Sequence, residues 1–429
     1  MKNIIPAILL AAIIGSSCNS SSINIFSNKT PHEKYADKLE DNGLEKTPEG
    51  RQWLAASAAA LRTPQAIQLP YRHSGLFPAD NPLALGLSFT AKQGERLTFA
   101  LTKNKAMNFV LYAELYKQEA NGAATLLHAA DTAATEFSYD VTEEGVAYIL
   151  KLQPQLFRSG SYDLSIAVGP SIGFPIAGGK GSVGSFWGAV RDAGKRSHEG
   201  IDIFASKRTP AIAAADGHIT GVRDGGIGGK TVWLRPADKN YTLYYAHLDE
   251  QLVQEGQSVK RGDTVGLVGN TGNAKYTPSH LHFGIYGNGG AVDPYPFVSK
   301  QKTASGIPDK KLPNHLRLLK DYKATDAVVK RNTLLVPLAY NSKGYIAVLP
   351  DGRMVQTSFA LVQSVVKPLK KTKAIAQAFV FNAPAKEAST KSTIQPGASV
   401  SVLGYFNEYV FVQAGEKEGW VLESAINGY

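Results

Sequence analysis

The sequence predicts a multidomain, mainly β chain with short helices near the amino terminus. Its 429 residues exceed one ordinary core, since domains usually contain about 100 to 200 residues. Hydrophobic residues make up 43% of the chain and charged residues 19%, which favours folded cores over disorder. Beyond residue 83, many segments alternate apolar with polar residues, which is the period of half-buried strands.

The first eighteen residues have the composition of an export signal. Lys2 precedes an apolar run over 4–14, which is too short to span a bilayer, and small residues follow the run. The single cysteine, Cys18, stands where a bacterial lipoprotein signal is cut and the new amino-terminal cysteine is acylated. We therefore expect 1–18 to be a lipoprotein signal peptide and Cys18 to carry a lipid. An ordinary cleavage site with an incidental cysteine is the alternative.

An exported, lipidated chain would be held at a membrane of the bacterial cell envelope, either the outer membrane or the cell surface. Its body would face the periplasm or the outside. No other stretch of the sequence approaches the length of a transmembrane helix. Any membrane attachment is therefore expected to be the lipid alone.

Residues 19–82 are predicted to form a tether followed by helices. The segment 19–29 is rich in Ser and Asn, as flexible linkers are. Helix-forming residues then dominate 35–61, where Gly43 and the start signal Thr47-Pro48-Glu49 divide them into two short helices.

Residues 83–170 are predicted to form a small β-sandwich. Apolar and polar residues alternate in several segments separated by Gly, Asn and Asp turns. These segments are 96–101, 109–116, 146–152 and 162–168. No cluster of catalytic residue types occurs among them, so a packing or substrate-positioning role is expected.

Residues 171–299 are predicted to form a compact antiparallel sheet domain with tight turns. Glycine runs at 225–229 and 287–290 interrupt short β-rich segments. Neither run opens a helix or precedes the Lys-Ser/Thr of a phosphate-binding loop, so we interpret both as turns.

The remainder is predicted to contain a linker followed by a β-rich region over 300–383, and then a further β domain over 384–429. We expect the β-rich region and the last domain each to form a small barrel. Residues 301–429 carry 17 Lys or Arg against 9 Asp or Glu. For an exported chain this excess argues against nucleic acid as a partner and favours the anionic polymers of the envelope. A solvated basic face without a partner is the alternative.

Four of the nine histidines fall within one segment, as His198, His247, His280 and His282. Asp202 lies four residues after the first of them, and the intervening Gly200 and following β-formers suit a strand better than a helix. Residues an even number apart on a regular strand share a face, so His198 and Asp202 form one pair and His280 and His282 another.

Two such pairs predict a metal centre. Imidazole nitrogen and carboxylate oxygen are common zinc ligands, and a catalytic site with three protein ligands keeps a fourth position for water. Zinc lowers the pKa of that water from ~15.7 to ~7, and a nearby imidazole then serves as general acid and base. Spacing alone leaves open which of His247, His280 and His282 bind the metal. The other five histidines, each isolated in the sequence, are expected to have structural or surface roles. They are His32, His73, His128, His218 and His315.

Several motifs of 172–298 together resemble the LytM/lysostaphin-type zinc metallopeptidases, a family of peptidoglycan endopeptidases. They combine H-x-x-x-D with a later H-x-H. The motifs are DAGKRSHEGIDIFA (192–205), YAHL (245–248), GNTG (269–272), SHLHF (279–283) and Val292-Asp293-Pro294.

The resemblance implies that His198, Asp202 and His282 bind one Zn²⁺, that His280 acts as general base and that His247 stabilises the oxyanion. It implies peptidoglycan as the substrate, with cleavage of cross-links or stem peptides. Gly419-Trp420-Val421, after an alternating β pattern, resembles bacterial SH3-like wall-binding domains. Two alternatives stay open, which are a non-enzymatic wall-binding activator of other hydrolases and a zinc peptidase acting on glycine-rich extracellular proteins. The scissile bond and the oligomeric state do not follow from the sequence.

Overall fold

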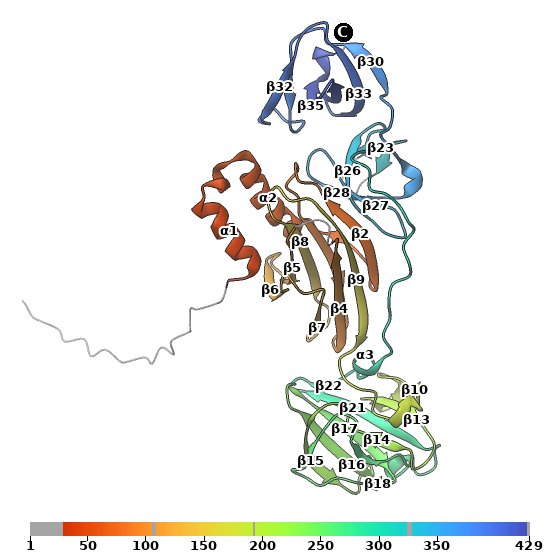
Figure 1. Cartoon of the computed structure of the whole chain (residues 1–429). Helices are drawn as coiled ribbons and strands as arrows, with labels where there is room; N and C mark the ends of the chain where they lie inside the picture. Colours follow the sequence, from red (N-terminus) through yellow and green to blue (C-terminus); the bar gives the residue numbers. More distant parts are fainter. Residues whose placement is uncertain (1–28, 105–108, 192–193, 324–327, 427–429) are drawn as a thin grey trace, which may run out of the picture.

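A computed structural model gives the fold, and it describes residues 29–104, 109–191, 194–323 and 328–426. The chain is elongated, with the sheets formed by residues 182–292 at one end and the sheet formed by residues 370–422 at the other (Figure 1). A sandwich of strands lies between them, and two helices cover one side of it. The expected export signal and Cys18 lie outside the described residues. Within the described ranges, no helix has both the length and the apolar character that crossing a bilayer requires.

The predicted pair of amino-terminal helices is confirmed. Helix α1 (Pro31–Asp41) starts with a capping box, because the Thr30 hydroxyl accepts a hydrogen bond from the Glu33 amide and the Glu33 carboxylate accepts one from the Thr30 amide. After η1 (Leu44–Lys46), helix α2 (Pro48–Arg62) starts with Thr47 as its cap. The indole of Trp53 on α2 is fully buried and donates to the Pro154 carbonyl, which anchors the helices to the sandwich.

The sandwich consists of two sheets packed on one apolar core, to which Leu87 and Leu150 of one sheet and Phe99 and Ile166 of the other contribute. We call them the short sheet and the long sheet. The short sheet is ordered β1 (Gln65–Ala66), β3 (Leu85–Thr90), β8 (Ala147–Pro154), β5 (Leu111–Gln118) and β6 (Ala124–Ala129). The long sheet is ordered β28 (Met354–Thr357), β27 (Tyr345–Val348), β26 (Leu334–Tyr340), β2 (Tyr71–Phe77), β9 (Gly160–Pro170), β4 (Glu95–Lys103) and β7 (Glu136–Asp140). Strand β23 (Leu316–Leu318) pairs with β26 and with β29 (Val362–Ser364).

The long sheet joins distant parts of the sequence. Strand β2 pairs with β26 through Ser74 opposite Tyr340 and Gly75 opposite Ala339. The sandwich therefore includes strands from both sides of the segment that carries the clustered histidines. Between β23 and β26 the sequence forms a short ladder of β24 (Tyr322–Lys323) and β25 (Val328–Val329). The turn η5 (Phe359–Leu361) follows β28.

The clustered histidines lie in a separate unit with its own apolar core. Its main sheet, the site sheet, is ordered β10 (Ser182–Ser185), β13 (Ile201–Phe204), β21 (His280–Gly287), β17 (Tyr241–Leu248), β16 (Lys230–Pro236), β15 (Gly217–Arg223) and β19 (Ser258–Val259), and β22 (Gly290–Val292) pairs with β21. A second sheet is ordered β14 (Pro210–Ile212), β20 (Thr264–Leu267) and β18 (Glu250–Gln251), and a hairpin joins β11 (Val190–Arg191) to β12 (Arg196–Ser197). The short helical elements are η2 (Ala177–Gly179), η4 (Gly272–Ala274) and α3 (Tyr295–Val298).

The chain passes from the sandwich into the histidine-bearing unit and back into the sandwich at one place, where the two crossing segments lie side by side. The amide of Val168 donates to the Lys302 carbonyl at 3.0 Å, and the amide of Lys302 donates to the Val168 carbonyl at 2.6 Å. Phe297 of α3 fills the space beside Gly94, where a Cβ atom would lie 2.1 Å from the ring. Asp140 accepts hydrogen bonds from Arg96 and from Lys239, which lies on the histidine-bearing unit.

The carboxyl-terminal sheet is antiparallel and ordered β30 (Lys370–Lys373), β33 (Ser399–Phe406), β34 (Tyr409–Ala414), β35 (Lys417–Leu422), β31 (Ala378–Phe381) and β32 (Thr390–Ile394), followed by η6 (Glu423–Ala425). No pairing between β30 and β32 closes this sheet in the described part of the chain. The mainly β, antiparallel architecture is confirmed. The closed SH3-like barrels are not confirmed and stay a prediction.

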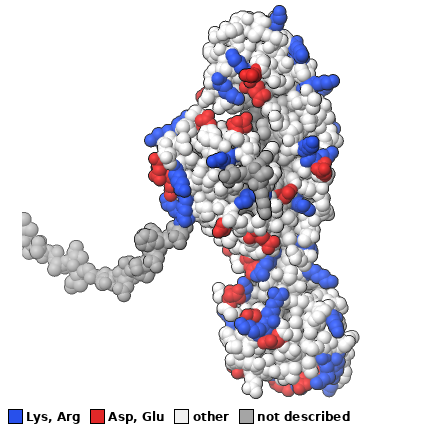
Figure 2. All heavy atoms as spheres, viewed as in Figure 1, with Lys and Arg blue, Asp and Glu red and all other residues white. Residues whose placement is uncertain are grey.

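Basic side chains are not confined to one region. On the face shown in Figure 2, Lys and Arg side chains are spread along the length of the molecule, with Asp and Glu side chains between them.

Candidate metal centre and active site

The predicted metal ligands come from two paired strands and the loop before one of them. Strand β13 carries Asp202, strand β21 carries His282, and the antiparallel register places these two residues opposite each other. His198 lies before β13, which begins at Ile201. The prediction that His198 and Asp202 share one face required a regular strand through both. Instead the chain bends at Gly200, and the loop before β13 brings the His198 imidazole next to the Asp202 carboxylate.

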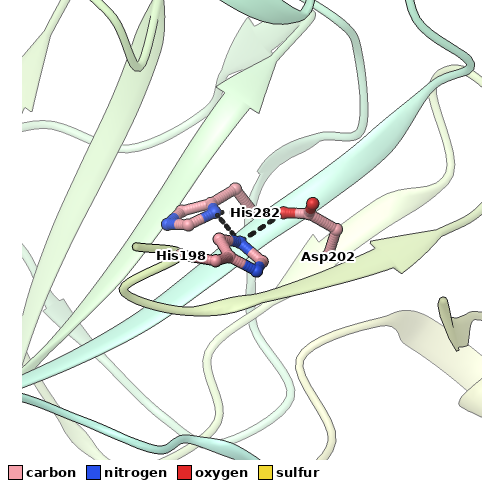
Figure 3. A group of neighbouring side chains, drawn as sticks. All are labelled: His198, Asp202 and His282. Carbon is pink, nitrogen blue, oxygen red and sulfur yellow. Dashed lines mark hydrogen bonds and ion pairs between the residues drawn. The ribbon is translucent and has the colours of Figure 1, made fainter. Parts of the chain in front are cut away.

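Three donor atoms of these residues converge on one point (Figure 3). His198 Nε2 lies 3.1 Å from Asp202 Oδ1 and 3.0 Å from His282 Nδ1. His282 Nδ1 lies 3.0 Å from Asp202 Oδ1, so the three atoms form a nearly equilateral triangle. Tetrahedral zinc with bonds of about 2.0 to 2.1 Å holds its ligands about 3.3 to 3.5 Å apart. The donors are within a few tenths of an ångström of that spacing, and their types suit zinc, so the residues fit the ion.

Neighbouring groups leave the converging atoms free to bind a cation. His198 Nδ1 lies 2.9 Å from the Phe186 carbonyl, to which it donates, so His198 Nε2 presents a lone pair. Asp202 Oδ2 accepts a hydrogen bond from Arg191 at 2.7 Å, so Oδ1 is the oxygen that faces the imidazoles. The arrangement therefore offers two nitrogen lone pairs and one carboxylate oxygen to a shared position.

The electrostatics of the ligands favour their metal-binding protonation states. Burial by itself would raise the pKa of the Asp202 carboxyl, but the adjacent imidazoles of His198 and His282 hold that pKa well below its usual value. Burial lowers the pKa of the His282 imidazole, although the neighbouring Asp202 partly opposes this. Asp202 is thus ionised and His282 neutral at pH 7, as cation binding requires.

The two other clustered histidines face the same cleft but do not join the triangle. His280 Nδ1 donates to the Pro278 carbonyl at 2.8 Å, and His247 Nδ1 donates to the Thr271 carbonyl at 2.9 Å. Each imidazole therefore keeps its Nε2 for another partner. Burial lowers the pKa of His247 to about 4, so His247 is neutral at pH 7.

The backbone of His247 has a left-handed conformation, with φ of 61°. This conformation costs a non-glycine residue about 1 to 2 kcal/mol. The His247 amide donates to the Gly228 carbonyl at 2.9 Å, which helps to hold the residue in place. The glycine run 225–229, interpreted from sequence as a turn, thus also packs against the site. Strain of this kind concentrates at functional positions.

These residues line an open cleft of about 650 Å³. Its lining includes the basic residues Arg191, Lys195 and Arg196 and the aromatic residues Tyr244 and Tyr286. A smaller hollow of about 360 Å³ lies where the histidine-bearing unit meets the sandwich, and no clustered histidine lines it. The wide, polar cleft is the part of this unit that is suited to receive an extended chain.

The isolated histidines lie away from the metal centre. His73 is fully buried between the hydroxyls of Tyr71 and Tyr162, each 3.1 Å from a ring nitrogen. His32 stacks on Trp53 and contacts the Gln153 amide oxygen at 2.7 Å. His128 stacks on Phe137 and His315 packs on Phe411.

Sequence reasoning missed three residues that shape the centre. Arg191 contacts the carboxylate of Asp202, and Ser185 contacts Arg191 and His198. A Cβ atom at Gly200 would lie 2.6 Å from His282 Cε1, so only glycine leaves room for that imidazole. The position of Gly200 between His198 and Asp202 was the one signal available, and it was used only to argue against a helix.

The peptidase family M23 model matches residues 196–294. An "Uncharacterized metalloprotease" of Haemophilus influenzae is 42% identical over 113 residues, which cover 26% of this chain and 23% of that protein. An "L-Ala--D-Glu endopeptidase" of Bacillus subtilis is 35% identical over 126 residues, covering 27% of this chain and 38% of the relative. The "Peptidoglycan DD-endopeptidase ShyC" of Vibrio cholerae is 36% identical over 94 residues, covering 22% of this chain and 21% of the relative. The chain thus spans less than two fifths of the length of these relatives.

Proposed function

We propose that this chain, which carries a domain of peptidase family M23, is a zinc-dependent endopeptidase that hydrolyses peptide bonds of bacterial peptidoglycan. The observation that carries the proposal is the triangle of His198 Nε2, Asp202 Oδ1 and His282 Nδ1, with two further imidazoles in the same cleft. By their descriptions, one of the relatives named above is a peptidoglycan DD-endopeptidase and another is an L-Ala–D-Glu endopeptidase, which supports this substrate class.

His198, Asp202 and His282 would hold one zinc ion. When bound, zinc makes water a nucleophile near neutral pH and polarises a substrate carbonyl. The resemblance of the SHLHF motif assigns His280 as general base, and its geometry is compatible with this role, because its Nδ1 donates to the Pro278 carbonyl and its Nε2 is left to accept a proton. The same imidazole then returns the proton to the leaving amine.

His247 is assigned to stabilise the oxyanion. In the resting protein His247 is neutral and its Nε2 lacks a proton, because Nδ1 donates to the Thr271 carbonyl and burial lowers the pKa. Negative charge developing on the carbonyl oxygen favours the protonated form of a nearby imidazole. His247 would take up a proton at Nε2 from solvent in the open cleft as the oxyanion forms, donate a hydrogen bond to the oxyanion, and return the proton to solvent when the negative charge is lost.

The remaining assignments concern the place of the reaction. A relative described as a peptidoglycan DD-endopeptidase supports action in the cell envelope or outside the cell. We propose export by 1–18, a lipid on Cys18 and attachment to the outer membrane or the cell surface, on the composition of that segment. We further propose that the predicted segments serve as functional units, with β2 and β26–β28 belonging to the sandwich and β30 and β31 to the carboxyl-terminal sheet. The segment 384–429 would bind the wall through an SH3-like domain.

Digestion of purified sacculi tests the function. Wild-type protein should release peptides with new amino termini, and mass analysis of the muropeptides identifies the scissile bond. His280→Ala should retain zinc and lose cleavage by about 10²- to 10⁴-fold, the usual contribution of general acid and base catalysis. His282→Ala should lose both zinc and cleavage.

Three results would contradict the proposal. Full cleavage by the His280→Ala variant or by chelator-treated protein would exclude the assigned chemistry. Sacculus binding without cleavage by the zinc-loaded wild type would favour an activator of other hydrolases. Cleavage of glycine-rich peptides in preference to muropeptides would move the substrate to extracellular proteins.

A further inference from the structure

We propose that Arg191 is a positioning residue that makes Asp202 offer a single oxygen to the metal centre and links Asp202 to His198 through Ser185. The inference rests on the proposed function, because it assumes that the triangle binds zinc. No sequence motif argued above assigns a role to Arg191 or Ser185.

The contact between Arg191 and Asp202 is close and partly shielded from water. Arg191 Nη2 lies 2.7 Å from Asp202 Oδ2, with 35% of the Arg191 side chain and 10% of the Asp202 side chain exposed. Asp202 Oδ1 is the oxygen that lies 3.0 to 3.1 Å from the two ligand imidazoles. The guanidinium therefore occupies one carboxylate oxygen and leaves the other for the cation.

Ser185 extends the link to a second ligand. Arg191 Nη2 also donates to Ser185 Oγ at 2.7 Å, and Ser185 Oγ lies 3.3 Å from His198 Nδ1. One nitrogen of Arg191 thus contacts Asp202 directly and His198 through a hydroxyl. Groups that hydrogen-bond to metal ligands fix ligand orientation and contribute to affinity.

The backbone of β10 explains why Ser185 reaches the site. The pairing of β10 with β13 shifts between Val183, opposite Ile203, and Ser185, opposite Asp202. Gly184 occupies the irregular position, and a Cβ atom there would lie 2.7 Å from the Phe204 ring. Bulges of this kind re-aim side chains near functional sites. Here the bulge places Ser185 beside the carboxylate that Arg191 contacts.

Two physical effects of Arg191 oppose each other. Its fixed positive charge repels a divalent cation, since arginine stays protonated in proteins. Its hydrogen bonds pre-orient the Asp202 carboxylate, which would otherwise be free to rotate away or to bind through both oxygens. The proposal holds that orientation exceeds repulsion, so removing the guanidinium should weaken zinc binding.

Zinc affinity, measured without substrate, tests this. The full chain is stripped with a chelator, and the zinc Kd is determined by competition with a chelating dye. We expect Arg191→Met to raise the Kd by about 10- to 100-fold, the usual cost of losing a partner of a metal ligand. Arg191→Lys should recover part of the loss. Ser185→Ala should raise the Kd less than Arg191→Met does. In the double variant Arg191→Met/Ser185→Ala, the fold-increase in Kd should be smaller than the product of the two single fold-increases, because both residues belong to one linked set of contacts.

Lys260→Met is the matched control, because it removes a basic residue that pairs with the surface residue Asp216 away from the site. It should leave the zinc Kd unchanged. Thermal unfolding of the metal-free proteins should show equal midpoints for wild type and Ser185→Ala, which separates positioning from folding. If Arg191→Met fails to fold, Arg191→Lys and Ser185→Ala carry the test.

An unchanged or lower zinc Kd in the Arg191 variants would overturn the inference while leaving the proposed function intact. A loss of affinity that Lys260→Met reproduces would also overturn it. Absence of zinc binding by the wild type would instead overturn the proposed function, and the inference with it.

Discussion

Which ring nitrogen a neighbour occupies determines what each histidine of the centre offers to the cleft. Backbone carbonyls accept hydrogen bonds from Nδ1 of His198, His247 and His280, so these residues present Nε2. His282 presents Nδ1. His282 lies opposite Asp202 in the pairing of β13 with β21, so its imidazole meets the carboxylate directly.

Gly200 should be required for the metal centre. In Gly200→Ala, the new methyl group would lie 2.6 Å from His282 Cε1 and 2.8 Å from the Phe283 carbonyl oxygen, so the imidazole has to move. We expect the zinc Kd to rise by at least about tenfold, since ligand geometry controls affinity. Equilibrium dialysis measures the effect.

Gly289→Ala provides the control for that substitution, because no atom lies within 4 Å of a Cβ placed at Gly289. It should bind zinc as the wild type does. Equal zinc affinity of the Gly200→Ala and wild-type proteins would show that the loop before β13 yields without moving His282.

His73 should make stability depend on pH. Burial lowers the pKa of its imidazole to about 3, whereas the unfolded value is near ~6.5. The unfolded chain therefore binds the proton more readily, and the stabilising contribution present above pH ~6.5 falls by about 1.4 kcal/mol for each pH unit down toward 3. Urea unfolding at pH 7 and pH 4.5 measures this loss.

His73→Gln is the comparison, because the amide can still contact the hydroxyls of Tyr71 and Tyr162 but does not titrate. The variant should lose less stability between the two pH values than the wild type does. Other buried histidines are common to both proteins and cancel in the difference. An identical pH dependence would mean that His73 is not neutral and buried in the folded protein.

At the residue scale, the sequence predicted which side chains lie together in the cleft but not what supports them. The spacing of His198, Asp202, His280 and His282 is local, and strand alternation applies to it directly. Arg191 and Ser185 act through contacts that depend on a bulge in β10, which no local pattern revealed. The bend at Gly200 likewise followed from packing against His282.

At the scale of elements, a buried polar network attaches the helices to the short sheet. Glu114 on β5 accepts hydrogen bonds from Thr30 before α1 and from Tyr116, and it pairs with Lys151 on β8 at 2.9 Å. Burial alone would raise the pKa of Glu114, but the neighbouring Lys151 and His32 bring it below its usual value. The carboxylate is therefore charged and fully partnered in the folded protein.

Glu114→Gln should destabilise the protein strongly. The Lys151 ammonium would be left buried without an opposite charge, and breaking a buried ion pair costs about 3 to 5 kcal/mol. Chemical denaturation measures the free energy of unfolding. Lys29→Met is the matched control, since it breaks the exposed pair with Asp37, and it should leave stability unchanged within error. Equal effects of the two substitutions would contradict the network's role.

The helices themselves were predictable and their anchoring was not. Thr47-Pro48-Glu49 is a local start signal, and α2 begins at Pro48. Thr30 contacts Glu114, and His32 contacts Gln153. The partners in these two pairs are about 80 to 120 positions apart in the sequence. Such pairings become visible only once the sheet is assembled.

At the scale of the whole molecule, separate cores predict separate unfolding. The histidine-bearing unit and the sandwich have different apolar clusters, joined by Asp140 with Lys239 and by the packing of Phe297 on Gly94. Calorimetry should resolve more than one transition. Zinc at 100 times its Kd should stabilise the unit that binds it by about 2.7 kcal/mol and shift only that transition.

His198→Ala should abolish the zinc-dependent shift while leaving the other transitions in place. If zinc shifts every transition equally, the units unfold as one cooperative body and the junction is stronger than its contacts suggest. Chelator treatment of the wild type should reproduce the unfolding profile of His198→Ala.

The sequence predicted the mainly β architecture but not how the long sheet is assembled. Alternation predicts strands, whereas the pairing of β2 with β26 joins Ser74 to Tyr340 across the entire histidine-bearing unit. Neither strand carries a local signal for its partner. The backbone groups along the edge of β2 or of β26 would form the same hydrogen bonds with another strand or with water. The domain order along the sequence therefore does not reveal which strands share a sheet.

The backbone bridge between Val168 and Lys302 brings the two chain ends of the histidine-bearing unit together, so this unit has the geometry of an exchangeable domain. A unit whose two chain ends meet can be replaced by another of similar end spacing without rerouting the frame that carries it. The sandwich and the carboxyl-terminal sheet would then stay unchanged while the unit between 168 and 302 is replaced. In protein engineering, this junction is where a peptidase domain of another bond preference would be grafted.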